Sequence, residues 1–276
     1  MHSCVRRFLS TACHKYEQTF YFIRHGTTEM NEILKTMEWG TDGFTDVALW
    51  DTRLSAAGLS QTIELHETWR KQCLPEADAA LRVIPWDKID LVLCSPLSRA
   101  LQTYTSLVQH AMPPLIDDQV PKVVHPLLRE RLYLASDTGS GRSVLESNFP
   151  HFNFSLLPKD DSAWWYTIDN NNVGTEFATE EGGDVNNSKE IKNANTSYEE
   201  WRPGHPSSYL CPGEPGSVFK LRLEYLRRVL LTRPERHILV VAHWGVLRGL
   251  TGHDFRNCEV KIVKADALLE ESIIDS

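Results

Sequence analysis

Three short runs of apolar residues constrain the fold of this 276-residue chain more than any other feature. They cover residues 20–23, 91–94 and 238–242, and none of them contains a charged side chain. Continuous apolar runs of this length are typical of strands whose sheet is covered by helices on both faces. The chain is therefore predicted to be an α/β protein, a three-layer αβα sandwich around a mostly parallel central sheet.

Two further segments have the spacing of an amphipathic helix. Apolar residues recur at intervals of four, three and four positions at Leu97, Leu101, Tyr104 and Val108, and again at Phe219, Leu223, Leu226 and Leu230. Ser95 and Pro96 suit the N-cap and the first position of the first of these helices. A third helix is expected from about Val246, after the last apolar run.

Charged and polar side chains follow each apolar run. Arg24 and His25 come directly after the first run, and Arg99 lies five residues beyond the second. His243 comes directly after the third run. Because the carboxyl ends of parallel strands meet at one edge of a sheet, these side chains are expected to form a ligand site there. Arg99 lies near the N-terminus of its own helix, where a cation is disfavoured, so we expect it to have an anionic partner.

Glu130 lies shortly after a candidate strand at residues 122–125. It has two interpretations, a solvated carboxylate in a loop or the proton donor that cleavage of a phosphate ester needs. The sequence of this segment does not separate the two.

The charge of the chain argues against a nucleic-acid partner. Residues 160–200 carry a net charge of −8, which equals the formal charge of the whole chain, and the remainder is balanced with no basic run. No apolar stretch is long enough to span a bilayer, so no membrane partner is expected. The six cysteines show neither a CxxC pair nor metal-finger spacing. They are interpreted as free thiols, which favours a cytoplasmic protein without a metal site.

The predicted domain organisation is simple. Residues 1–18 are expected to be a disordered terminus or, alternatively, a presequence for mitochondria or another organelle, since residues 1–16 contain basic but no acidic side chains. Residues 19–276 are expected to form a single domain. An acidic, asparagine-rich loop is predicted to be inserted at about 166–200, where large apolar residues are few.

Five short motifs occur in an order that resembles a known family. In chain order they cover residues 24–31 (Arg-His-Gly with Asn31), 51–61, 94–103, 128–131 (Leu-Arg-Glu-Arg) and 242–248 (Ala-His-Trp-Gly-Val-Leu-Arg). This order is similar to that of the histidine phosphatase superfamily, in its phosphoglycerate mutase-like branch. The resemblance extends from about residue 20 to residue 252 and is interrupted by the acidic loop.

The resemblance implies a metal-independent phosphatase that hydrolyses a small phosphorylated substrate through a phosphohistidine, with no cofactor. It implies three catalytic residues, His25, Glu130 and His243, and four substrate-binding residues, Arg24, Asn31, Arg99 and Trp244. In this scheme His25 is the nucleophile and Glu130 protonates the departing oxygen. His243 and the two arginines hold the phosphoryl oxygens, Asn31 adds a hydrogen bond, and Trp244 lines the pocket mouth.

Two alternatives remain at this stage. A cofactor-dependent phosphoglycerate-type mutase is disfavoured, because no lysine and no pair of arginines follows Glu130 to hold a second anionic group. The second alternative is a catalytically silent protein that binds a phosphorylated ligand. It would apply if Trp244 and the acidic loop obstruct the pocket. Asp137 and Arg142 are interpreted as substrate contacts or as a structural ion pair.

Overall fold

The computed structural model describes residues 18–37, 46–72, 85–109, 116–159 and 214–270. Residues 1–17 and the whole acidic segment 166–200 lie outside these ranges, so the N-terminal segment, the inserted loop and the single domain of residues 19–276 stay predictions. Within the described ranges, no helix has the length and apolar character needed to cross a membrane.

A five-stranded sheet with the order β3-β2-β4-β1-β5 forms the centre of the molecule. The strands are β1 (Thr19–Arg24), β2 (Leu91–Cys94), β3 (Lys122–Val124), β4 (His237–Ala242) and β5 (Val260–Lys264). The first four are parallel to one another, and β5 pairs antiparallel with β1 at the edge. The predicted α/β fold with a mostly parallel central sheet is confirmed.

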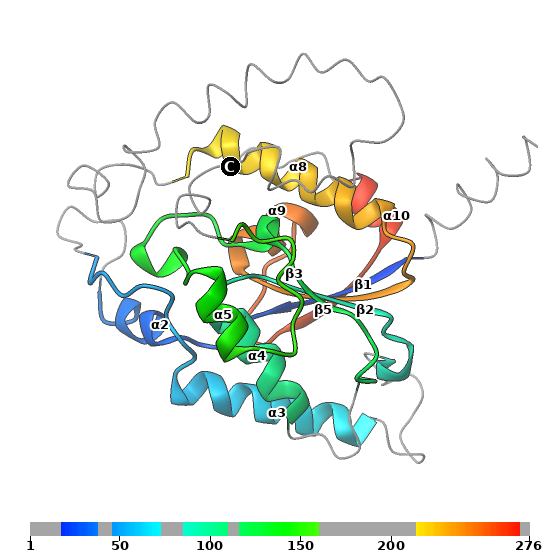
Figure 1. Ribbon diagram of the computed structural model, residues 1–276, viewed down its shortest axis with the longest axis horizontal. Helices are drawn as coiled ribbons and strands as arrows, with labels where there is room; N and C mark the ends of the chain where they lie inside the picture. The colour runs from blue at the N-terminus through cyan, green and yellow to red at the C-terminus, as the bar shows by residue number, and fades with distance from the viewer. Residues whose placement is uncertain (1–17, 38–45, 73–84, 110–115, 160–213, 271–276) are drawn as a thin grey trace, which may run out of the picture.

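Helices cover both faces of the sheet (Figure 1). The helices are α2 (Glu29–Leu34), α3 (Ala56–Gln72), α4 (Ser98–Gln109), α5 (Arg142–Asn148), α8 (Gly216–Thr232), α9 (Trp244–Thr251) and α10 (Ala265–Glu270). In Figure 1, α3, α4 and α5 lie on one side of the sheet and α8, α9 and α10 on the other. The result is the predicted three-layer sandwich.

The side chains of β1 show why its apolar run is continuous. Phe20 and Phe22 point into the core under α8, α9 and α10, whereas Tyr21 and Ile23 point into the core under α3 and α4. Successive strand residues face opposite sides of a sheet, so a strand covered on both sides needs an apolar residue at every position. Burying each phenylalanine contributes about 2–3 kcal/mol.

Two helix starts differ from the sequence-based expectation. α4 begins at Ser98, and the Ser95 hydroxyl accepts a hydrogen bond from the Leu97 N–H at 3.3 Å in a turn before the helix. The Ser98 N–H is bound instead by the carboxylate of Asp51 at 2.8 Å. α9 begins at Trp244, two residues before Val246, and His243 occupies its N-cap position. A carboxylate from a distant loop thus takes part in capping α4, which local sequence does not reveal.

Candidate active site

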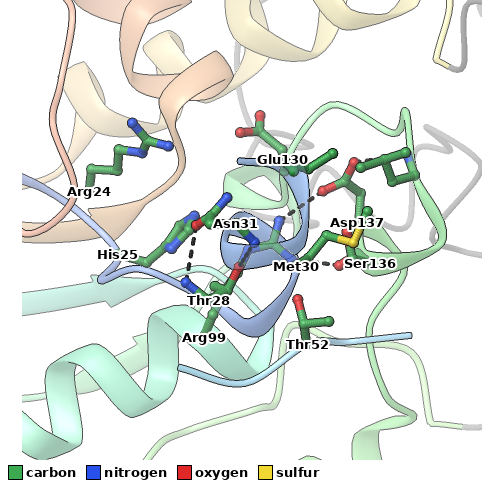
Figure 2. Close-up of a pocket in the computed structure, with 12 residues that line it drawn as sticks. Arg24, His25, Thr28, Met30, Asn31, Thr52, Arg99, Glu130, Ser136 and Asp137 are labelled. Carbon is green, nitrogen blue, oxygen red and sulfur yellow. Dashed lines mark hydrogen bonds and ion pairs between the residues drawn. The ribbon is translucent and has the colours of Figure 1, made fainter. Parts of the chain in front are cut away.

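The polar residues that follow the strands meet around a small cavity of about 90 Å³ (Figure 2). Five of the seven predicted site residues line it: Arg24, His25, Asn31, Arg99 and Glu130. The other lining residues are Thr28, Met30, Leu34, Thr52, Leu134, Ser136 and Asp137. The sheet order explains this convergence, because β4 lies between β1 and β2 and all three strands end at the same edge.

His25 is held as a neutral imidazole. Its Nδ1 lies 2.7 Å from the carbonyl oxygen of Gly26, which can only accept, so Nδ1 carries the proton and Nε2 keeps its electron pair. Burial and the positive charges of Arg99 and Arg24 hold the pKa of His25 well below its ordinary value. An unprotonated ring nitrogen in this environment can act as a nucleophile.

Two glycines fix the turn that carries His25. The Gly26 N–H donates to the Thr103 hydroxyl at 3.0 Å, and a Cβ atom on Gly26 would lie 2.9 Å from the carbonyl oxygen of Gly58. A Cβ atom on Gly58 would in turn collide with the carbonyl oxygen of Thr27. The first two sequence motifs are therefore in backbone-to-backbone contact, which places the turn after His25 against the start of α3.

Arg99 has the anionic partner that its position in the helix predicts. Its guanidinium forms an ion pair with Asp137 at 2.9 Å and donates to the Ser136 carbonyl oxygen at 2.5 Å. The second Asp137 oxygen accepts from the backbone N–H groups of Tyr133 and Leu134 at 3.2 and 3.0 Å. Asp137 therefore joins Arg99 to the segment that follows Glu130.

Asp137 and Arg142 do not pair with each other. Arg142 instead pairs with Glu146 one turn along α5, at 2.7 Å, and the side chain of Glu146 is largely exposed. Of the two, only Asp137 lines the cavity. The interpretation of these residues as one structural ion pair is wrong, because each has a nearer partner of opposite charge.

His243 lies behind the cavity and does not line it. The ring is fully buried, with its centroid 4.9 Å from that of His25. Arg99 Nε donates to His243 Nδ1 at 3.3 Å, so the proton is on Nε2, which donates to the Ser95 hydroxyl at 2.6 Å. Burial and the charge of Arg99 lower the pKa of His243 well below its ordinary value. In this tautomer His243 supports Arg99 from behind.

Trp244 is placed outside the cavity. Its indole is 41% exposed, and its N–H donates to Asp254 at 3.1 Å. The guanidinium of Arg248 lies 5.1 Å from the centre of the ring. The predicted position of Trp244 at the pocket mouth is therefore not supported by its contacts.

Asn31 is held at the cavity wall by reciprocal capping of α2. Its side-chain oxygen accepts from the Thr28 N–H at 3.1 Å, and the Thr28 hydroxyl accepts from the Asn31 N–H at 3.0 Å. This arrangement is a capping box, which satisfies two backbone donors at the start of a helix. Figure 2 shows Asn31 next to His25.

Glu130 is a half-buried carboxyl in a loop, and its defined partners argue against a freely solvated side chain. It accepts from the backbone N–H groups of Arg131 at 2.8 Å and Gly245 at 3.1 Å. Burial and the charge of Asp137 nevertheless raise the pKa of Glu130. A Cβ atom on Gly245 would lie 2.5 Å from Glu130 Oε1, so this glycine makes room for the carboxyl group.

Arg222 and Glu214 hold the segment that carries Glu130, and no sequence motif identified them. Both side chains are fully buried and form an ion pair at 2.6 Å, with Arg129 a second partner of Glu214 at 3.5 Å. The Arg222 guanidinium donates to the carbonyl oxygens of Leu127 and Arg129 at 2.9 and 2.7 Å, and to that of Glu130 at 3.3 Å. The one signal in the sequence that could have identified Arg222 is its position beside Leu223, within the apolar stripe of α8.

In the described part of the chain, no group of three or more His, Cys, Asp or Glu side chains is arranged to hold a metal ion. Cys94 and Cys258 are buried free thiols. The other four cysteines lie outside the described residues.

Comparison with known proteins gives partial matches. No family model matches the sequence. The chain is 28% identical over 144 residues to a protein of Schizosaccharomyces pombe described as a probable phosphatase, covering 52% of this chain and 55% of the relative. It is 32% identical over 136 residues to agropine synthesis reductase of Rhizobium rhizogenes, covering 48% of this chain and 25% of the relative. The chain thus spans about half and a quarter of the lengths of these relatives.

Among solved structures, an ecdysone phosphate phosphatase from Bombix mori is similar, with a TM-score of 0.49 and 12% identity over 94% of this chain and 96% of the other. An alpha-ribazole phosphatase from Shigella flexneri has a TM-score of 0.38 and 22% identity over 91% of this chain and 84% of the other. Both of these solved structures are described as phosphatases, and each is less than 25% identical to this chain.

Proposed function

We propose that this chain is a metal-independent phosphatase that hydrolyses a phosphomonoester through a phosphohistidine on His25. The observation that carries the proposal is the pairing of a neutral, buried His25 with the carboxyl group of Glu130 across one cavity. The pKa of His25 is lowered and that of Glu130 is raised. Opposite shifts of this kind give a nucleophile and an acid at the same pH.

In the first step, His25 Nε2 attacks phosphorus and the bond to the leaving oxygen breaks. Glu130 transfers its proton to that oxygen, so the leaving group departs as a neutral alcohol or phenol. The positive charge that develops on the imidazole is stabilised by the Nδ1–H hydrogen bond to the Gly26 carbonyl oxygen.

In the second step, water attacks the phosphohistidine. The Glu130 carboxylate accepts a proton from this water as the new P–O bond forms, and the N–P bond breaks with its electron pair returning to Nε2. Phosphate is released, and both His25 and Glu130 are again in their starting states. The two steps balance without any further reactant.

Two guanidinium groups supply the charge that phosphoryl transfer needs at the equatorial oxygens. Arg24 Nε is buried without a hydrogen-bond partner in the described part of the chain, so this donor is available to a phosphoryl oxygen. Arg99 is oriented by Asp137 and, through its Nε, by His243. We assign Asn31 a hydrogen bond to the phosphoryl group and His243 a positioning role on Arg99. Trp244, which lies outside the cavity, is given no substrate contact.

The cavity favours a phosphatase over a mutase. A mutase acting on phosphoglycerates needs cations for the substrate carboxylate as well as for the phosphoryl group. Among the described lining residues, the cations are Arg24, Arg99 and the titratable His25, all at the phosphoryl end. Arg131 lies outside the cavity lining, with its guanidinium 4.7 Å from the ring of Tyr133.

The proposed partner is a small phosphorylated molecule, and the proposed compartment is the cytoplasm. The compartment follows from the spacing of the cysteines, which favours free thiols. The alternative is an organelle reached through a presequence in residues 1–16. Imaging the tagged chain with and without residues 1–16 tests this alternative. Deleting these residues should change the location of the protein only if they are a presequence.

The experiment that tests the function is phosphate release from p-nitrophenyl phosphate in the presence of a chelator. We expect wild type to turn over, His25→Ala to be inactive, and the exposed control His253→Ala to match wild type. Wild type should also form an acid-labile phosphoenzyme that His25→Ala lacks. No release from wild type between pH 5 and pH 7.5 would favour the silent binding protein, and equal release from His25→Ala would mean a different nucleophile.

A further inference from the structure

The cavity has an apolar end as well as a phosphoryl end. Met30, Leu34 and Leu134 form its apolar lining. Together with Met37 they pack as a small cluster that is separate from the two main cores. Met30 and Leu134 are 2% and 7% exposed, so an apolar group entering the cavity would meet side chains already removed from water.

Thr52 presents an unsatisfied hydroxyl group to the same cavity. The residue is 3% exposed, and its Oγ1 has no hydrogen-bond partner within the described ranges. Figure 2 shows this oxygen directed toward the cavity. A buried hydroxyl without a hydrogen-bond partner is unfavourable, and a ligand that hydrogen-bonds to Thr52 would remove this penalty.

The charges around this end disfavour a second anionic group. Asp137 and Glu130 place two carboxyl groups in the cavity wall. Among the described lining residues, the arginines Arg24 and Arg99 are at the phosphoryl end, where Arg99 forms an ion pair with Asp137. A carboxylate or second phosphate on the leaving group would be desolvated beside acidic side chains, which is unfavourable.

We propose that this end of the cavity is a leaving-group subsite for an uncharged alcohol or phenol with an apolar body and one hydrogen-bonding group that contacts Thr52. The inference rests on the proposed phosphatase function and specifies the substrate class of that site. Met30, Leu34 and Leu134 contact the apolar body, and Thr52 is the specificity-determining residue.

Aryl phosphates of matched size test the substrate class. The probes are phenyl phosphate, 4-carboxyphenyl phosphate, and the 2-, 3- and 4-(hydroxymethyl)phenyl phosphates. We expect kcat/KM for the carboxyphenyl ester to be at least about tenfold below that for phenyl phosphate. At least one hydroxymethyl isomer should exceed phenyl phosphate by about threefold to tenfold, the worth of one hydrogen bond. A carboxyphenyl ester as good as phenyl phosphate would overturn the uncharged class.

Two substitutions test the residue. In Thr52→Val, which keeps the shape but removes the hydroxyl, the ratio of kcat/KM for the best hydroxymethyl isomer to that for phenyl phosphate should fall to about one. In Thr52→Ser the ratio should be kept. An unchanged ratio in Thr52→Val, or no preferred isomer with wild type, overturns the Thr52 contact. Absence of His25-dependent turnover with every probe would instead overturn the proposed function itself.

Discussion

Glu130 and His25 divide the proposed chemistry between an acid and a nucleophile, and substitution separates the two roles. In Glu130→Gln the carboxyl proton is lost while the shape is kept. We expect kcat for an alkyl phosphate to fall about 10²–10³-fold, whereas p-nitrophenyl phosphate, whose leaving group needs little protonation, should lose less than about tenfold. Steady-state kinetics with both substrates measures the difference. The control Glu146→Gln, on the exposed face of α5, should match wild type, and equal losses on both substrates would contradict the role of Glu130.

The directions of the pKa shifts predict the pH dependence of the reaction. His25 acts in its neutral form, and burial lowers its pKa, so activity should persist below pH 6.5. Glu130 acts in its protonated form, and burial raises its pKa, so the alkaline loss of activity should occur above the ordinary range of a glutamate. A profile of kcat/KM against pH for an alkyl phosphate should be bell-shaped, with the acidic limb set by His25 and the alkaline limb set by Glu130. Glu130→Gln should lack the alkaline limb that wild type shows.

Individual residues differ in how far the sequence predicts their place. The anionic partner of Arg99 follows from helix electrostatics, although its identity as Asp137 depends on how residues 133–137 fold back. Strand-end positions predict that Arg24 and His25 meet Arg99 and Glu130. Trp244 was expected in the pocket because it follows His243, but the helix that starts there directs its indole to Asp254. The direction in which a side chain leaves its helix depends on how the helix packs in the fold, so a motif alone does not determine it.

Among the elements, the contact between α3 and the turn after β1 predicts the effect of one substitution. Gly58 lies inside α3, where alanine would normally be favoured, but its Cβ atom would collide with the Thr27 backbone. We expect Gly58→Ala to destabilise the protein by several kcal/mol and to reduce activity, because the clash displaces the His25 turn. Urea unfolding measures this. Gly216→Ala, where the nearest atom would be 3.7 Å away at the end of a side chain, is the control and should change stability by less than about 1 kcal/mol. Equal effects of the two substitutions would contradict the argument.

The buried ion pair between Arg222 of α8 and Glu214, in the segment before this helix, predicts a more selective defect. Arg222→Lys keeps the charge but loses the planar group that donates to the carbonyl oxygens of Leu127, Arg129 and Glu130. If the pair positions Glu130, the ratio of alkyl phosphate to p-nitrophenyl phosphate activity should fall about tenfold. The matched control Arg233→Lys alters a partly buried ion pair with Glu235 and should keep the ratio. A loss of stability with an unchanged ratio would show that Arg222 is structural only.

Elements whose pattern is purely local were predicted well, and those that depend on distant partners were not. The three apolar runs became β1, β2 and β4, and the stripe around Leu223 became α8. β5 was missed because it is an edge strand of mixed burial, with Ile262 exposed and Val263 buried. The start of α4 was placed too early because Asp51, a residue 47 positions away, accepts hydrogen bonds from the N–H and the hydroxyl of Ser98.

The molecule as a whole buries histidines in neutral form, and this predicts acid sensitivity. Burial lowers the pKa of His125 from its ordinary value to about 4. The folded state therefore binds fewer protons than the unfolded state between about pH 6.5 and pH 4, so stability is full above this range and falls as the pH decreases through it. For His125 alone the loss between pH 7 and pH 5 is about 2 kcal/mol, and His25 and His243 act in the same direction.

Urea unfolding of wild type and His125→Asn at pH 7 and pH 5 isolates this contribution. His125 accepts a hydrogen bond from the Leu127 N–H at 3.2 Å, and the asparagine oxygen can accept the same bond without titrating. We expect the loss of stability between the two pH values to be about 2 kcal/mol smaller in the variant, whatever its absolute stability. An equal loss in both proteins would mean that His125 already binds a proton in the folded state, and that the fold tolerates a charge beneath the segment that carries Glu130.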